Sequence, residues 1–167
     1  MRQKMFSIVG KSGAGKTTLL EKLIPEIKRR GRKVAAVKHD IRRFEIDYPG
    51  KDSYRLYNAG ADIVMLSSTE KLALVRRCEQ TLSLEAAIAQ YLPDMEILLI
   101  EGFKQGPLPK IEIHRKEHSP DLLCRGECRD PTLIAVASND TLALDVPVLP
   151  LDDVAAIADF IEHWTAC

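Results

Sequence analysis

An eight-residue stretch near the N-terminus has the residue types of a phosphate-binding loop. Residues 10–17 read GKSGAGKT and satisfy the pattern G-x-x-x-x-G-K-[ST] at Gly10, Gly15, Lys16 and Thr17. Glycines in such a loop let backbone N–H groups converge on an anion at the start of a helix. A flexible glycine-rich turn is the simpler explanation, but it requires neither Lys16 nor Thr17. The stretch therefore predicts a site for a nucleotide polyphosphate.

Each part of the loop has a defined chemical role in this prediction. Small residues let the backbone pass close to phosphate oxygens, the lysine reaches the β- and γ-phosphates, and the threonine hydroxyl ligates Mg²⁺. The predicted nucleotide-binding residues are Gly10, Gly13, Ala14, Gly15, Lys16, Thr17 and Thr18. Lys11 has two interpretations: a solvent lysine near the anion, or a lysine that reaches the nucleotide of a partner subunit, as in dimeric ATPases with a similar loop.

A magnesium site also needs an acidic residue at the carboxyl end of a buried strand. Residues 97–101 read ILLIE, the most continuous apolar run of the chain, so we expect a central strand that is buried on both faces. Glu101 closes this run. We therefore expect Thr17 and Glu101 to hold Mg²⁺ or its water shell.

Strand-like and helix-like patterns alternate around these residues, which predicts an α/β fold. We expect a P-loop NTPase-like three-layer fold, in which helices flank a mostly parallel sheet that has some antiparallel edge strands. Expected strands span residues 4–9, 33–38, 62–67, 70–77, 97–101, 110–114, 132–137 and 146–149, and expected helices span residues 15–30, 52–60, 83–92 and a last stretch that ends near residue 165. Residues 110–114 (KIEIH) alternate in polarity, so this strand is expected to be half-exposed and near an edge.

Length and composition indicate one soluble domain. The chain has 167 residues, of which 46% are hydrophobic and 29% charged. We expect a single nucleotide-binding domain over residues 1–167. No apolar run reaches the length of a membrane span and the N-terminus has no secretory pattern, so we expect a cytoplasmic protein that does not bind a membrane. We also expect no nucleic-acid partner. Four cysteines in a chain of this size indicate reduced thiols rather than a disulfide framework.

Charge is unevenly distributed although the net charge is zero. Residues 1–60 contain 15 basic and 6 acidic residues, and residues 61–167 contain 9 and 18. This asymmetry suits an anionic ligand near the N-terminal end of the chain, or charge complementarity between two copies.

Two other groups of residues are weaker signals. His114, His118, Cys124 and Cys128 suggest zinc only superficially, because their spacing is unlike that of common zinc sites. Residues 139 and 140 (Asn-Asp) follow the strand at 132–137, where P-loop GTPases place an aspartate that contacts guanine. The full Asn-Lys-x-Asp pattern is missing, and a simple turn explains the pair equally well.

Five stretches together resemble the MobB family of molybdopterin-guanine dinucleotide biosynthesis adapter proteins. They read GKSGAGKTTLLEKLI, VKHD, FEIDYPGKDSYRLYNAGAD, IEGFK and KIEIHR. The resemblance runs from residue 5 through the last helix. Its DxPGKDSYR pattern is far more specific than the phosphate loop, which marks only a superfamily.

The resemblance implies a GTP-binding, weakly hydrolysing protein that uses Mg²⁺ and is usually a homodimer. It implies an adapter in molybdenum cofactor biosynthesis whose partners are molybdopterin and the guanylyltransferase that attaches GMP to it. It places the phosphate site on residues 10 and 13–18, and the acidic strand end on Glu101. The family's loop pattern fits Lys38, His39, Asp47, Lys51, Asp52, Ser53 and Tyr54.

The chain departs from this family at two places. Many relatives have two histidines where this chain has residues 41–43 (Ile-Arg-Arg), and a His-Arg pair where it has residues 56–57 (Leu-Tyr). Asp40 then becomes an additional candidate for positioning water or metal. The expected ligand loop therefore contains His39, Asp40, Asp47, Lys51, Asp52 and Ser53, and we expect it to become ordered on binding nucleotide or pterin. An ordinary charged surface loop is the alternative.

Two other functions use the same phosphate loop. A small-molecule kinase would need an arginine-rich lid, which residues 115–130 could imitate, and a dimeric partner-positioning ATPase would use Lys11. No residue is an obvious strong general base or arginine finger, so no catalytic residue is assigned and hydrolysis is expected to be slow.

Overall fold

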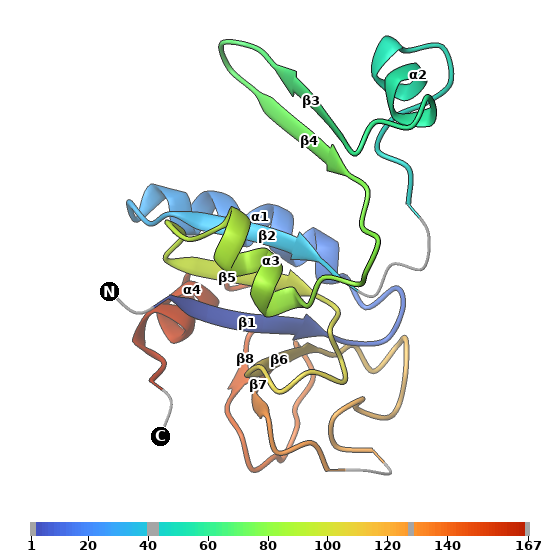
Figure 1. Ribbon diagram of the computed structural model, residues 1–167. Coiled ribbons are helices and arrows are strands. Elements are labelled where there is room, and N and C mark those ends of the chain that lie inside the picture. Colours follow the sequence, from blue (N-terminus) through green and yellow to red (C-terminus); the bar gives the residue numbers. More distant parts are fainter. Residues whose placement is uncertain (1–2, 40–43, 127–128, 166–167) are drawn as a thin grey trace. The chain divides into compact units, whose positions relative to one another are not determined.

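The computed structural model describes residues 3–39, 44–126 and 129–165 of the chain (Figure 1). The chain forms two compact units. The first consists of residues 1–40 together with 94–167, and the second consists of residues 41–93. The first unit contains the phosphate loop, and each unit is described by itself below. Among the helices of the described ranges, none has both the length and the apolar composition of a membrane span.

A six-stranded sheet of parallel neighbours forms the centre of the first unit, in the order β2-β5-β1-β6-β7-β8. Its strands are β1 (Lys4–Val9), β2 (Val34–Lys38), β5 (Ile97–Glu101), β6 (Lys110–Ile113), β7 (Leu133–Ala137) and β8 (Val148–Leu149). Glu101 pairs in register with Ile8 on one side and Lys38 on the other. The carboxyl ends of β1, β2 and β5 therefore lie at one edge of the sheet, which is where α/β proteins bind ligands.

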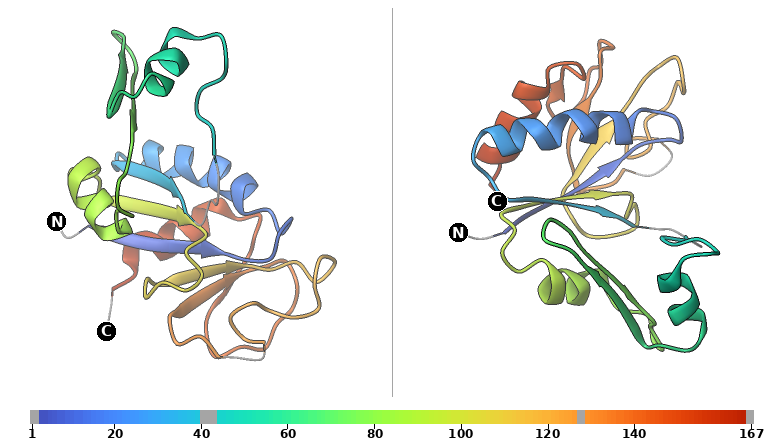
Figure 2. Two further views of the ribbon diagram at one scale, coloured as in Figure 1. Left: turned by 45° about the vertical axis from the view of Figure 1, so that its right-hand side comes forward. Right: turned by 90° about the horizontal axis from the view of Figure 1, so that it is seen from above.

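Two helices cover one face of this sheet. Figure 2 shows α1 (Lys16–Arg29) and α4 (Val154–His163) side by side over the strands. The apolar stripe of α1 (Leu19, Leu20, Leu23 and Ile27) is buried in one core with residues 157, 158 and 161 of α4 and the inward side chains of β1 and β5. Asp153 caps α4, because its carboxylate accepts a hydrogen bond from the N–H of Ala156. Burial of this stripe holds α1, and hence the loop before it, against the sheet.

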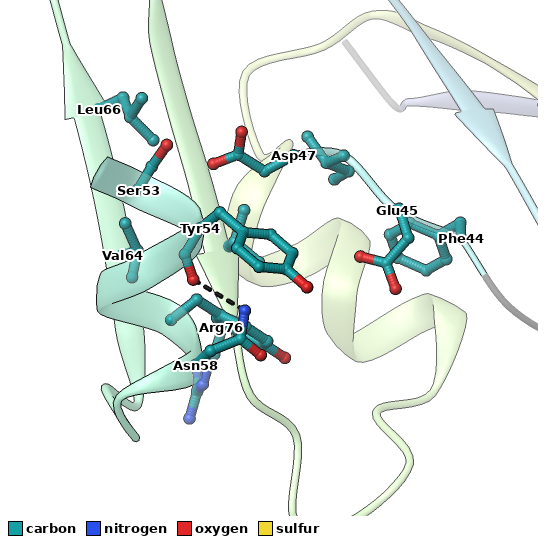
Figure 3. Close-up of a pocket in the computed structure, with 12 residues that line it drawn as sticks. Phe44, Glu45, Asp47, Ser53, Tyr54, Asn58, Val64, Leu66 and Arg76 are labelled. Carbon is teal, nitrogen blue, oxygen red and sulfur yellow. Dashed lines mark hydrogen bonds between the residues drawn. The ribbon is translucent and has the colours of Figure 1, made fainter. Parts of the chain in front are cut away.

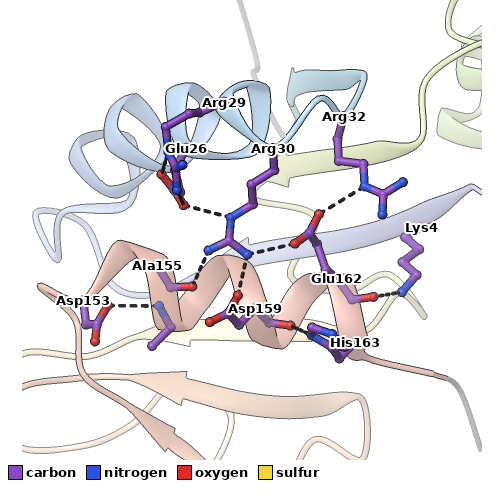
Figure 4. Close-up of polar contacts among 11 residues, drawn as sticks. Lys4, Glu26, Arg29, Arg30, Arg32, Asp153, Ala155, Asp159, Glu162 and His163 are labelled. Carbon is purple, nitrogen blue, oxygen red and sulfur yellow. Dashed lines mark hydrogen bonds and ion pairs between the residues drawn. The ribbon is translucent and has the colours of Figure 1, made fainter.

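Ion pairs join the end of α1 to α4 at the surface (Figure 4). The guanidinium of Arg30 lies 2.8 Å from a carboxylate oxygen of Glu26, 2.5 Å from Asp159 and 2.8 Å from Glu162. Arg32 also contacts Glu162, at 3.1 Å. These pairs form a network around Arg30, which is worth more than isolated surface pairs.

The second unit is a hairpin with two helices. It contains α2 (Asp52–Asn58), the antiparallel strands β3 (Ile63–Ser67) and β4 (Leu72–Arg76), and α3 (Leu84–Tyr91). Ser83 caps α3 by accepting a hydrogen bond from the N–H of Ala86, as expected of a serine at the start of a helix. All the large apolar side chains that are exposed in the described residues belong to this unit: Phe44, Ile46, Tyr48, Leu56, Ile63, Met65, Leu66, Leu72, Leu74, Leu82 and Tyr91.

The α/β fold with a mostly parallel sheet and flanking helices is confirmed. The antiparallel strands differ from the expectation in one respect, because they form a separate two-stranded sheet and not an edge of the large one. The run at 97–101 is buried as expected in its first four residues, between β1 and β2. Pro25 lies inside α1, which continues to Arg29.

The prediction of a half-exposed edge strand at 110–114 is wrong. β6 lies between β1 and β7, and all four of its residues are buried. Its polar residues have partners within the protein: Lys110 Nζ lies 3.0 Å from Asp130 and donates to Gly106 O at 2.7 Å, and the Glu112 carboxylate accepts from the N–H of Leu123 and of Cys124. Alternating polarity reflects these internal partners and not contact with water.

Candidate nucleotide-binding site

Residues 10–15 turn the chain from β1 into α1 with a backbone that only glycine adopts readily. Gly10, Gly13 and Gly15 have φ angles of 148°, 81° and 94°. A Cβ at Gly10 would lie 2.6 Å from the carbonyl oxygen of Ile113. Gly15 is the N-cap of α1 and provides no side-chain cap, so the first N–H groups of the helix are available to an anion.

Positive charge gathers at this loop. Lys16 Nζ donates hydrogen bonds to the carbonyl oxygens of Gly10 (3.1 Å) and Lys11 (2.9 Å). Burial lowers the pKa of Lys16, repulsion from Lys104 and Lys38 lowers it further, and Glu101 acts in the opposite direction. Lys104 and Lys38 each lie close enough to repel Lys16, and a bound polyphosphate would offset this repulsion.

Thr17 and Glu101 meet at the carboxyl end of β5. The Thr17 hydroxyl lies 3.2 Å and 3.1 Å from the two carboxylate oxygens of Glu101. Lys38 Nζ lies 3.9 Å from the same carboxylate, whose side chain is 15% exposed. A hydroxyl and a carboxylate are oxygen ligands of the type that Mg²⁺ prefers, so these residues fit the metal that the sequence predicts.

The turn after β5 is strained and compact. Gly102 and Phe103 have φ angles of 96° and 55°, and Phe103 is a rare left-handed residue that is not glycine. The Phe103 ring packs edge-to-face on His39, with 4.6 Å between the ring centroids. The N–H of His39 donates to the carbonyl of Glu101 at 3.0 Å. This turn therefore holds His39 at the strand edge where Glu101 lies.

Arg115 is a residue of this site that sequence reasoning did not single out. Its Nε lies 3.7 Å from the position of a Cβ at Gly15, directly beside the start of α1. Its ion pair with Glu117 is loose, at 3.9 Å, and the side chain of Glu117 is 72% exposed. The signal that could have found it is its place two residues after β6, whose carboxyl end meets the same sheet edge as the loop.

The other arginines of residues 115–130 are used elsewhere. Arg125 lies 2.8 Å from Asp145, and Arg129 lies 2.5 Å from the same carboxylate. Lys11 Nζ donates to Ser119 Oγ of its own chain at 2.5 Å. The segment after β6 is therefore tied to the phosphate loop through Lys11 and Ser119.

The expected ligand loop is divided between the two units. His39 belongs to the first unit, Asp40 lies outside the described residues, and the remaining members belong to the second unit. A hydrogen bond from Ser53 lowers the pKa of Asp47, the N–H of Tyr48 adds to this, and Lys51 lies 4.0 Å away. Asp52 instead faces Arg55, at 3.5 Å.

Asn139 and Asp140, which the sequence offered as possible contacts to guanine, form hydrogen bonds within the protein. Asn139 accepts from the N–H of Leu151 and donates to Asp152, and Asp140 accepts from the N–H of Lys116 and from Ser138. These bonds are those of a turn that joins β7 to neighbouring loops.

The histidine and cysteine group does not form a metal site in the part of the chain that the structure describes, which has no group of three or more potential ligands. His114 and Cys124 are buried, and burial raises the pKa of the Cys124 thiol to about 12, with a contribution from Glu112. Cys128 and Cys167 lie outside the described residues. Cys78 and Cys124 are free thiols.

Comparisons with known proteins identify a family and several relatives that this chain resembles over most of its length. The sequence profile described as "Molybdopterin guanine dinucleotide synthesis protein B" (MobB) matches residues 5–139. The chain is 39% identical to the molybdopterin-guanine dinucleotide biosynthesis adapter protein of Haemophilus influenzae over 164 residues, which cover 96% of this chain and 88% of that protein. It is also 39% identical to the protein of the same description from Escherichia coli K12 over 158 residues, which cover 92% of this chain and 88% of that protein.

A solved structure has the same fold. The crystal structure described as molybdopterin-guanine biosynthesis protein B matches with a TM-score of 0.75 at 30% identity, and the match covers 95% of this chain and 97% of that one. The similarity in sequence and in fold therefore extends over almost the whole chain.

Proposed function

This chain belongs to the MobB family, and from that premise we propose that it is an adapter in molybdopterin guanine dinucleotide biosynthesis that binds GTP and Mg²⁺ at its phosphate loop. The nucleotide-binding residues of this proposal are Gly10, Gly13, Ala14, Gly15, Lys16, Thr17 and Thr18. Thr17 and Glu101 hold the metal, which when bound neutralises phosphate charge.

The observation that carries this proposal is the convergence of three features at one point. The uncapped N-terminus of α1, the amine of Lys16 and the Thr17–Glu101 pair come together at the carboxyl edge of the sheet. A helix N-terminus and a lysine bind phosphate oxygens, whereas a hydroxyl and a carboxylate bind the metal that accompanies them.

Hydrolysis of GTP by the isolated protein is proposed to be weak. Glu101 already faces Thr17 and Lys38, which suits holding a metal better than activating water. The protein then acts mainly through the nucleotide-bound state, with slow turnover.

The partners of the proposal are molybdopterin, the guanylyltransferase of molybdenum cofactor maturation and a second copy of this chain. The exposed apolar side chains of the second unit support an interaction with other proteins, because soluble monomers rarely leave so many large apolar residues in contact with water. Five of them lie on the strands of the β3–β4 hairpin, and three lie in residues 44–48, before α2.

Observations weigh against the two alternative functions. A kinase lid needs several arginines that close over the nucleotide, but Arg125 and Arg129 are paired with Asp145, which leaves Arg115 as the one arginine of residues 115–126 and 129–130 beside the phosphate loop. A partner-positioning ATPase needs Lys11 to reach another subunit, but Lys11 is bonded to Ser119 of its own chain.

Titration of GTP onto the protein with Mg²⁺, by calorimetry, tests the proposal. Lys16→Ala should abolish measurable binding and retain the melting temperature, because this lysine is bonded only to carbonyls of its own loop in the described structure. Lys28→Ala, on the same helix, is the matched control and should bind like the parent. Unchanged GTP affinity in Lys16→Ala, or displacement of GTP by equimolar ATP, would overturn the assignment.

The adapter role has its own test. Co-purification with the guanylyltransferase, with and without GTP and molybdopterin, should yield a complex whose recovery depends on GTP. If the Lys16→Ala protein forms the same complex to the same extent, binding of the guanylyltransferase does not require the nucleotide site.

A further inference from the structure

The second unit contains a cavity that the proposed GTP site does not use. Its volume is about 380 Å³, which is within the range of sites for small molecules. Residues before α2, α2 itself and both strands of the hairpin line it, so the cavity is formed within residues 41–93 alone. Figure 3 shows the ring of Tyr54 and the side chains of Phe44 and Glu45 at this cavity.

Two charged side chains of the lining are not neutralised within the described part of the chain. Glu45 has no ion pair or hydrogen bond to its carboxylate there. Arg76 bonds to the hydroxyl of Tyr91 at 3.3 Å but faces no carboxylate within ion-pair distance in the same part. By contrast, Asp47 accepts from Tyr48 and Asn58 donates to the Tyr54 carbonyl. Glu45 and Arg76 thus offer one acceptor and one cation to a ligand.

Aromatic and apolar side chains supply the other walls. Tyr54 lines the cavity, and Phe44 is 64% exposed although it has a large apolar ring. Val64 and Val75 come from opposite strands of the hairpin and pair in register. A flat ring placed here would cover the aromatic faces, and stacking of this kind contributes about 1–3 kcal/mol for a nucleobase.

We propose that this cavity binds a 2-amino-4-oxopyrimidine ring that carries a phosphate group. The 2-amino group and the neighbouring ring N–H donate two parallel hydrogen bonds to the Glu45 carboxylate, the ring lies on Tyr54, and Arg76 donates to the phosphate. A pterin and a guanine share this ring edge. The expected source is the phosphorylated pterin of the pathway, because the phosphate loop already binds the nucleotide; this choice of source rests on the proposed function.

Neopterin monophosphate, a fluorescent pterin with a phosphate on its side chain, is the probe. Titration of the whole protein should quench its fluorescence. Glu45→Gln should weaken binding about tenfold or more, as expected for loss of charge-assisted hydrogen bonds. Arg76→Gln should remove the advantage of neopterin monophosphate over neopterin. Glu70→Gln and Arg55→Gln, which change exposed charges of the same unit, are the controls and should bind like the parent.

Competition distinguishes the two sources of the ring. Displacement of the probe by GMP but not by inosine monophosphate, which lacks the 2-amino group, supports recognition of the ring edge. If GMP binds more tightly than the probe, the natural ligand of the cavity is a guanine nucleotide and not the phosphorylated pterin. Equal displacement by the two nucleotides, no binding of the probe at millimolar concentration, or unchanged binding in both Glu45→Gln and Tyr54→Leu would overturn the proposal.

The phosphate-loop variant separates this proposal from the proposed GTP site. Lys16→Ala should lose GTP and still bind neopterin monophosphate with the affinity of the parent, because every lining residue of the cavity belongs to the second unit. Loss of probe binding in Lys16→Ala would overturn the assignment of the probe to this cavity, even if GTP binding at the phosphate loop is as proposed.

Discussion

Thr17 Oγ1 lies 3.1 Å from one carboxylate oxygen of Glu101 and 3.2 Å from the other, although 84 positions separate the two residues in the sequence. The parallel register between β1 and β5 pairs Ile8 with Glu101 and so brings the end of β5 to the start of the phosphate loop. Thr17 lies in the first turn of α1 and Glu101 is the last residue of β5, so the contact between them depends on how this helix and this strand pack. Both oxygens are of the kind that bind Mg²⁺.

Glu101→Gln should remove the dependence of GTP binding on Mg²⁺. An amide has no charge to balance the metal, so we expect GTP affinity in Mg²⁺ to fall about tenfold or more, to the value measured in EDTA. Calorimetric titration in the two buffers measures this. Glu21→Gln, at an exposed position of α1, is the control. If Glu101→Gln still binds GTP more tightly in Mg²⁺ than in EDTA by the parent's factor, Glu101 does not hold the metal.

Arg115→Ala should weaken GTP binding by about tenfold or more, since a charge-assisted hydrogen bond to phosphate contributes roughly 1.5–3 kcal/mol. Binding should also depend less steeply on salt, because one cation near the phosphates is lost. Arg115→Lys should restore part of the affinity. Arg129→Ala, which removes an arginine of the same segment paired with Asp145, should have no effect on GTP. Equal affinities in Arg115→Ala and the parent would place Arg115 outside the site.

Gly10→Ala should abolish GTP binding by displacing the loop. The new Cβ would lie 2.6 Å from Ile113 O and would have to accept a φ of 148°. We expect a loss of roughly 1–3 kcal/mol in the free energy of unfolding, measured by urea denaturation. Gly31→Ala is a matched control for backbone strain, because Gly31 also has a positive φ (79°) but nothing within 4 Å of an added Cβ; it should lose stability and still bind GTP.

The Arg30 network should make stability depend on pH under acid conditions. Hydrogen bonds from Arg29 and Arg30 lower the pKa of Glu26 from 4.5 to about 2. A folded-state pKa below the unfolded one means that the charged carboxylate stabilises the fold above pH 4.5, and that this contribution is lost as the pH falls toward 2. The melting temperature should fall over this range at low salt. Glu26→Gln should show a smaller fall than the parent; an identical profile would mean that these exposed bonds do not stabilise the protein.

Local features of the chain could be predicted from the sequence because neighbours along the chain determine them. The three glycines around Lys16 have positive φ angles, Ser83 caps its helix, and the hairpin pairs as expected. Turn, cap and periodicity patterns act over a few residues, so they can be recognised without a fold. The sequence also predicted that Thr17 and Glu101 lie close together, because the alternating pattern indicates parallel strands whose carboxyl ends share one edge of the sheet.

For the other contacts between elements, only the tertiary structure decided which side chains face one another. Lys110 and Glu112 have the polarity of a surface strand, but Asp130 and the backbone of residues 123–124 compensate them in the interior. Arg115 lies beside Gly15, whereas Arg125 and Arg129 turn to Asp145, although one short segment contains all three. A sequence records residue types in order, but strand order and partner choice depend on the free energy of contacts between distant segments, which periodicity does not encode.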